Sequence, residues 1–147
     1  ENLSEKIYAT DISPDALQVT QENMQLHNIG GIRVACHDFL KKGFKTRFEV
    51  VISNPPYIGI NEIDNLQEEV RNFDPRQALT DYADGYVFYR RFAKKFDDIV
   101  SSGGYILLEI GGVVHKEGVE KIFSKAGLQV KFYKDLQGDF RVAEVRK

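Results

Sequence analysis

The sequence predicts an α/β fold, with a doubly wound and mostly parallel sheet that ends in an antiparallel hairpin. Two observations predict it. Short β-branched and aromatic runs alternate with segments of helical apolar spacing, and the turn-forming sequence Gln137-Gly138-Asp139 separates the last two runs. Parallel strands need crossover connections, whereas a short turn joins antiparallel strands. No linker, repeat or low-complexity tract interrupts the pattern, so residues 1–147 are expected to form a single domain or most of one.

The first third of the chain is predicted to fold as strand, helix, strand and strand. Residues 6–10 are a short β-branched and aromatic run, and Ser13 followed by Pro14 is typical of a helix start. Apolar residues then recur at helical spacing until two glycines at 30–31, where the helix is expected to end. Apolar runs at 32–36 and 48–53 predict two further strands, which a loop connects.

The rest of the chain begins with an irregular stretch and then returns to alternating elements. Residues 54–84 are rich in polar residues and hold three prolines, so they are the candidate functional loop. The following pattern predicts, in order, a helix at 85–100, a turn at 102–104, a central strand at 105–110, a helix at about 115–126, and strands at 129–133 and 141–145.

Composition bounds the function. The 147 residues hold 20 Lys and Arg against 22 Asp and Glu, for a net charge of −2, which gives no electrostatic footprint for a nucleic acid. One cysteine and three histidines without ligand spacing predict no metal site, and a reducing, cytoplasmic setting. No apolar run is long enough to span a membrane. Because the chain lacks a starting Met and a strand follows within a few residues, we expect a fragment of a longer protein.

Polar residues follow the first two predicted strands, where such sheets bind ligands. Asp11 could accept hydrogen bonds from two ribose hydroxyls, or it could begin a turn with Ser13. Asp38 could accept from an adenine amine while Phe39 lies against the ring, or it could be an ordinary loop residue. Together the two acids are more informative than either one alone.

The third predicted strand is followed directly by Asn54-Pro55-Pro56-Tyr57. The side-chain oxygen of Asn54 and the carbonyl of Pro55 are acceptors that could hold the N–H groups of a planar amide or amine, with Tyr57 against its face. The alternative is a stiff structural turn, because two prolines fix the backbone. Glu109, at the end of the central strand, is expected to be a structural hydrogen-bond partner rather than a general base.

These segments resemble a known enzyme family. Residues 9–17, 38–39 and 53–58 resemble S-adenosylmethionine-dependent amino-methyltransferases, and the Asn-Pro-Pro-Tyr tetrapeptide is shared with enzymes that methylate DNA or RNA amines. Residues 69–79, 84–91, 108–111 and 134–138 are more narrowly similar to the release-factor glutamine N5-methyltransferases, the HemK/PrmC family. The resemblance implies a Rossmann-like methyltransferase fold and a partial catalytic domain at 1–147. It also implies methyl transfer to the glutamine amide in the Gly-Gly-Gln motif of a peptide chain release factor.

The resemblance also implies site residues. The cofactor S-adenosylmethionine would be bound by Asp11, Ile12, Asp38, Phe39 and Asn54. The catalytic tetrapeptide would be Asn54, Pro55, Pro56 and Tyr57, with Asn54 and Pro55 holding the glutamine amide. Two other functions stay open: methylation of an exocyclic amine of DNA or RNA, and a non-catalytic fragment.

One expected part of the family's domain is absent. Its glycine-rich cofactor loop and first strand should precede Lys6, and residues 1–5 cannot supply them. The chain alone is therefore expected to bind the cofactor weakly or not at all. In the family's strand order, 3-2-1-4-5-7-6, loss of strand 1 would expose two inner edges. Unpaired edges favour association, so the chain is expected either to be marginally stable as a monomer or to pair these edges with another chain.

Overall fold

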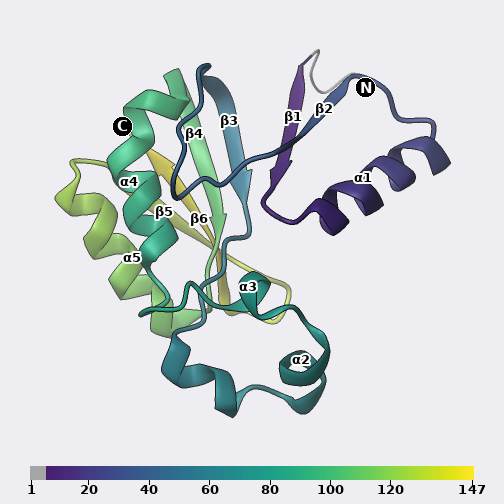
Figure 1. The fold of residues 1–147 in the computed structure, drawn as a ribbon. Helices are drawn as coiled ribbons and strands as arrows, with labels where there is room; N and C mark the ends of the chain where they lie inside the picture. Colours follow the sequence, from purple (N-terminus) through teal and green to yellow (C-terminus); the bar gives the residue numbers. More distant parts are fainter. Residues whose placement is uncertain (1–5) are drawn as a thin grey trace. The chain divides into compact units, whose positions relative to one another are not determined.

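The structure is a computed structural model that describes residues 6–147, and the chain divides into two compact units. Unit 1 is Glu1–Gly43 and unit 2 is Phe44–Lys147. In unit 1, strands β1 (Ile7–Asp11) and β2 (Ile32–Cys36) pair in parallel, and helix α1 (Pro14–Leu26) connects them (Figure 1). The register aligns Asp11 with Cys36, so both strands end at the same edge.

Helix α1 begins where the sequence predicts. The Ser13 hydroxyl accepts a hydrogen bond from the Ala16 N–H at 3.3 Å, and Pro14 occupies the first helical position, where a missing N–H costs nothing. The helix ends at Leu26, and Asn28 takes a left-handed conformation with φ 53° just beyond it. No residue of unit 1 within the described range 6–43 is buried. Unit 1 therefore has little core of its own.

Unit 2 holds a four-stranded sheet in the order β3-β4-β6-β5. Its strands are β3 (Phe48–Ser53), β4 (Val100–Glu109), β5 (Gln129–Lys134) and β6 (Phe140–Arg146). Strand β3 is parallel to β4, whereas β6 pairs antiparallel with both β4 and β5. The predicted α/β class and the C-terminal antiparallel hairpin are thus confirmed. The strand order within each sheet also agrees with the order expected from the resemblance.

Two long helices cover the sheet of unit 2, and three short helical segments precede them. The long helices are α4 (Val87–Ile99) and α5 (Val113–Lys125), and the short segments are η1 (Ile60–Asn65), α2 (Glu68–Phe73) and α3 (Arg76–Leu79). Helices α4 and α5 lie side by side, as Figure 1 shows. The short segments fall within the predicted irregular stretch. The sequence did not predict them as helices, because four to six residues are too few to show helical apolar spacing.

The hydrophobic core of the described residues lies in unit 2. Aromatic side chains of α4 contribute to it, with Phe92 and Phe96 only 4% and 5% exposed. Tyr89, on the same helix, is fully buried. The other large apolar side chains that are less than 2% exposed lie on α4, β4, α5 and β6 or directly after β4: Ile99, Ile106, Leu108, Ile110, Val119, Phe123 and Val145.

The glycines predicted to form a turn before β4 lie inside this strand instead. Gly103 has φ 78°, and the pairing of β3 with β4 shifts register between Phe48 and Val50. A Cβ atom on Gly104 would lie 2.5 Å from the Glu49 carbonyl oxygen. The two glycines therefore permit a bulge and a close backbone approach, rather than a reversal of the chain.

Strand β3 is one of the two edge strands of its sheet within the described part of the chain. Two of its apolar side chains are exposed, Val50 at 41% and Ile52 at 75%. An edge that carries apolar side chains favours pairing with another strand. Self-association therefore stays a prediction, and light scattering during size exclusion tests it.

Candidate functional site

The predicted cofactor residues of unit 1 gather at the carboxyl ends of β1 and β2. Asp11 is the last residue of β1, and its carbonyl accepts a hydrogen bond from the His37 N–H at 2.9 Å. The Asp11 Oδ1 accepts from the Ser13 N–H at 2.8 Å, so the turn alternative is also realised. Within the described residues no donor reaches Oδ2 of this exposed carboxylate. Next to it the Ile12 side chain is 50% exposed, which offers an apolar surface beside an open acceptor.

Asp38 is held by its own loop. Its Oδ1 accepts hydrogen bonds from the backbone N–H groups of Leu40 at 3.1 Å and Lys41 at 3.2 Å, while Oδ2 lies 3.2 Å from Lys41 Nζ. Burial raises the pKa of Asp38, but the hydrogen bonds and charge of Lys41 together bring it below its ordinary value. The carboxylate is therefore ionised and oriented. Each of its oxygens has two lone pairs, so Oδ2 can still accept from an amine. The neighbouring Phe39 is half-buried.

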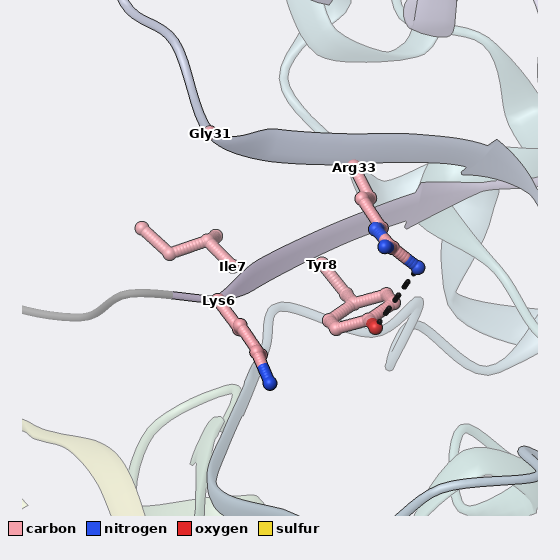
Figure 2. Close-up of a pocket in the computed structure, with 5 residues that line it drawn as sticks. All are labelled: Lys6, Ile7, Tyr8, Gly31 and Arg33. Atoms are coloured by element: carbon pink, nitrogen blue, oxygen red, sulfur yellow. Dashed lines mark hydrogen bonds between the residues drawn. The ribbon is translucent and has the colours of Figure 1, made fainter.

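A cavity of about 280 Å³ lies at the opposite ends of the same two strands (Figure 2). It is lined by Lys6, Ile7, Tyr8, Gly31 and Arg33. The Arg33 guanidinium donates to the Tyr8 Oη at 3.4 Å and lies 5.5 Å from the centre of its ring. Because Asp11 is the last residue of β1 and Asp38 follows the carboxyl end of β2, this cavity is separate from the predicted cofactor residues.

The tetrapeptide at 54–57 leaves β3 at its carboxyl end, in unit 2. Asn54 is exposed, Pro55 is buried, and Pro56 and Tyr57 are half-buried. Pairing of Ser53 with Leu108 brings the start of this loop next to the end of β4. The Asn54 amide therefore faces solvent from a stiff segment whose remaining residues are packed into the protein.

Tyr57 is anchored to the end of β4. Its Oη donates to Glu109 Oε1 at 3.1 Å, and its ring lies edge-on to that of His115, with 5.6 Å between the ring centres. Burial, with the nearby Glu109 carboxylate, raises the pKa of Tyr57, so the phenol stays protonated near neutral pH. The prediction that Glu109 is a structural hydrogen-bond partner is confirmed. Tyr89 adds to this junction, because its Oη donates to the Glu109 carbonyl at 2.7 Å.

Two glycines allow the backbone to approach this junction. Gly85 has φ 81°, and a Cβ atom there would lie 2.4 Å from the Tyr57 carbonyl oxygen. A Cβ atom on Gly111 would lie 3.1 Å from both the Tyr57 ring and His115 Nδ1. The tetrapeptide thus packs against two connections at positions where only glycine fits without movement of neighbouring atoms.

Sequence reasoning missed His115 and Gly85 as parts of the site. Both lie at the starts of predicted helices, where residues are ordinarily read as helix caps. Pairs of glycines after a strand, as at 111–112, are a signal for close packing that could have directed attention to His115. No group of three potential metal ligands occurs in residues 6–147, and none of the helices there has the length and apolarity needed to cross a membrane.

Comparison with known proteins supports the resemblance. The family described as "Methyltransferase small domain" matches residues 1–72. A release factor glutamine methyltransferase of Bacillus subtilis is 35% identical over 96% of this chain, and a bifunctional methyltransferase of Rickettsia felis is 36% identical over 93%. The chain spans 50% of the length of the Bacillus subtilis relative and 26% of the length of the Rickettsia felis relative.

Solved structures agree on the fold. A ribosomal protein L11 methylase of Lactobacillus delbrueckii matches 98% of this chain and 58% of its own, with a TM-score of 0.67 and 13% identity. A methyltransferase of Pyrococcus furiosus matches 95% of this chain and 61% of its own, with a TM-score of 0.64 and 18% identity. The chain therefore has the Rossmann-like fold of S-adenosylmethionine-dependent methyltransferases, and it is similar to the release factor glutamine methyltransferases over almost all of its length.

Proposed function

We propose that the protein containing this chain transfers a methyl group from S-adenosylmethionine to the side-chain amide nitrogen, N5, of a glutamine. The substrate is the Gly-Gly-Gln motif of a peptide chain release factor. One observation carries the proposal: Asn54-Pro55-Pro56-Tyr57 leaves the end of β3 in a chain that is 35% identical over 96% of its length to a release factor glutamine methyltransferase.

Asn54 and Pro55 would orient the nitrogen. An amide nitrogen is a poor nucleophile because its lone pair is delocalised into the carbonyl group. The Asn54 side-chain oxygen and the Pro55 carbonyl oxygen can each accept one of its two N–H groups. Two fixed hydrogen bonds set the plane of the amide and leave one face open to an electrophile. Orientation of this kind is a major source of rate acceleration.

Tyr57 would support the tetrapeptide rather than remove a proton. Its hydroxyl already donates to Glu109, and its raised pKa keeps it protonated near neutral pH. A general base must instead offer a free lone pair within reach of the proton. Tyr57 and Glu109 are therefore positioning residues for the loop that carries Asn54.

The cofactor would be held by unit 1. The open Oδ2 of Asp11 suits a ribose hydroxyl, the exposed Ile12 suits the apolar edge of a nucleoside, and the oriented Asp38 suits an adenine amine. When bound, S-adenosylmethionine supplies a methyl group that its sulfonium sulfur already activates. Orientation of the acceptor nitrogen is then the main task of residues 54–57.

Calorimetric titration with S-adenosylmethionine tests the cofactor residues. Asp11→Asn keeps the acceptor for the Ser13 N–H but removes the charge that holds the ribose hydroxyls. Binding should weaken about tenfold or more, since hydrogen bonds to a charged group contribute about 1.5–3 kcal/mol. Asp15→Asn, on the exposed start of α1, is the matched control and should bind as the unmodified protein does. Equal affinities for the two variants would exclude Asp11 from the cofactor site.

Mass spectrometry tests the reaction. The natural gene product that contains these 147 residues is incubated with a release factor and S-adenosylmethionine. The peptide with the Gly-Gly-Gln glutamine should gain the mass of one methyl group. Asn54→Ala should abolish the gain, whereas Asn23→Ala, on the exposed surface of α1, should leave it intact.

The other functions predict different results. Labelled methyl groups recovered in DNA or RNA, with none in the release factor, would replace this proposal with methylation of an exocyclic amine. The absence of transfer to all three, in a protein that binds the cofactor, would refute the proposal and favour a non-catalytic role.

A further inference from the structure

A second cavity lies in unit 2, next to the tetrapeptide. It is an open cavity with a volume of about 210 Å³, and three connections line it: the loop after Tyr57, the segment before α4 and the start of α5. The residues that matter for its chemistry are Gly59, Glu62, Asp84, Tyr86, Val114 and His115. Its lining includes two carboxylates and no lysine or arginine. A cavity whose charged groups all have one sign favours a ligand of the opposite sign.

The two carboxylates differ in what they can still bind. Asp84 forms a bidentate salt bridge with the Arg90 guanidinium, at 2.9 and 2.7 Å, so its negative charge is already neutralised. Glu62 accepts only from the backbone N–H of Gly59, through Oε2 at 2.9 Å. Within residues 6–147 no lysine or arginine pairs with Glu62. The cavity therefore contains one carboxylate whose charge is unbalanced.

The tyrosine of the cavity is fixed in place. A Cβ atom on Gly118 of α5 would lie 2.6 Å from the ring of Tyr86, so the ring rests on bare helix backbone. Its other neighbour is His115, with 4.8 Å between the ring centres. An aromatic face at the wall of an acidic cavity favours a cation, through attraction to its π electrons.

His115 forms part of the wall of the cavity. The residue is only 7% exposed, and its Nδ1 has no hydrogen-bond partner in the described part of the chain. Burial lowers the pKa of His115, while Glu62 and Asp81 oppose that effect, so the ring is neutral near pH 7. Nδ1 lies on the Gly111 side of the ring, since a Cβ atom built on Gly111 would be 3.1 Å from it. Buried polar groups of this kind ordinarily have partners.

We propose that this cavity binds a guanidinium side chain of the protein substrate, beside the residue that Asn54 orients. A guanidinium is planar, so it can donate to Glu62 while it stacks on Tyr86. The His115 ring separates the cavity from Tyr57, which it contacts edge-on. The place of this arginine in the substrate rests on the proposed function, whereas binding of the guanidinium by the cavity does not.

Nuclear magnetic resonance titration tests the cavity directly. The probes are acetyl-arginine-methylamide and acetyl-citrulline-methylamide, which have the same shape but differ in charge. The arginine probe should shift the backbone amide signals of Gly59, Tyr86 and His115, and the citrulline probe should shift them far less. Equal shifts from both probes, or shifts confined to other parts of the protein, would overturn the proposal.

Two matched variants identify the carboxylate that binds the probe. Glu62→Gln keeps an oxygen for the Gly59 N–H but removes the charge, and it should weaken arginine binding about threefold to fivefold. Glu120→Gln removes a charge that pairs with Lys116 on the exposed side of α5, and it should leave binding unchanged. Equal arginine affinities for these two variants would refute a role for Glu62.

The two proposals fail in different ways. If the release factor is not methylated but the arginine probe still binds the cavity, the guanidinium site stands and the proposed reaction is wrong. If the release factor is methylated and citrulline binds as well as arginine, the guanidinium site is wrong and the proposed reaction stands.

Discussion

Replacement of Gly85 by alanine should destabilise the protein by more than the cost of the left-handed backbone alone, because the new Cβ atom would also clash with the tetrapeptide. The new Cβ atom would lie 2.4 Å from the Tyr57 carbonyl oxygen, whereas unstrained contacts are about 3.5 Å. A left-handed conformation costs an alanine about 1–2 kcal/mol, and overpacking adds about 1–3 kcal/mol. Gly85→Ala should therefore lower the free energy of unfolding by about 2–5 kcal/mol.

Gly127 provides the matched control. It has φ 73°, similar to the 81° of Gly85, but nothing lies within 4 Å of a Cβ atom built there. Gly127→Ala should cost only the conformational part, about 1–2 kcal/mol. Urea unfolding of both variants measures the difference, and it should fall at about 1–3 kcal/mol.

The activities of the two variants should differ more than their stabilities. Relief of the clash must move the Tyr57 backbone, and a misplacement of about 1 Å can cost about a hundredfold in rate. Gly127→Ala should methylate as the unmodified protein does, since Gly127 lies beyond the far end of α5. Equal stabilities and equal rates for the two variants would refute the reasoning that the tetrapeptide backbone packs closely here because Gly85 has no side chain.

Four further predictions follow from packing, hydrogen bonding and burial. Tyr89→Phe removes the 2.7 Å bond to the Glu109 carbonyl and should lower the free energy of unfolding by about 1–3 kcal/mol in urea; an unchanged midpoint would contradict it. Phe123→Ala empties a fully buried position and should cost about 3–5 kcal/mol by the same assay, unless the core collapses around it. Because burial lowers the pKa of His115 below 6.5, the unfolded chain binds its proton more tightly, so stability should fall as pH drops through 6.5, and His115→Gln should flatten that slope. Hydrogen exchange should be faster in α1 than in α5, because no residue of unit 1 in the range 6–43 is buried; equal protection would contradict it.

Much of the fold is predictable because its signals are local. The bounds of β2 and β3 agree with the apolar runs at 32–36 and 48–53, and Ser13 caps α1 as its sequence indicates. The predicted turn at 102–104 lies inside β4, because glycine also permits a bulge in a strand. Local sequence cannot distinguish these two uses of glycine, since the outcome depends on the neighbouring strand.

The site is predictable only in part. Asp11 is the last residue of β1 and Asn54 directly follows β3, close to the strand ends that the sequence predicts. Their proposed roles remain predictions. The partners of Tyr57 have no local signature: Glu109 is 52 residues away, and His115 lies on a different element. Such contacts depend on how α5 and β4 pack, and no short motif predicts this packing.

The bulge in β4 has a consequence for the tolerance of this protein to insertions and strand slippage. Gly104 is the point where the Glu49 carbonyl abuts a residue without a side chain. A slip of two residues would bring a side chain against that carbonyl, and at about 3.3 Å per residue it would carry the tetrapeptide about 6.6 Å away from Glu109. The alignment of Asn54 with the end of β4 is therefore set at the distant end of the strand pair. Insertions between 49 and 53 should be far more harmful than insertions of the same length in the hairpin at 135–139.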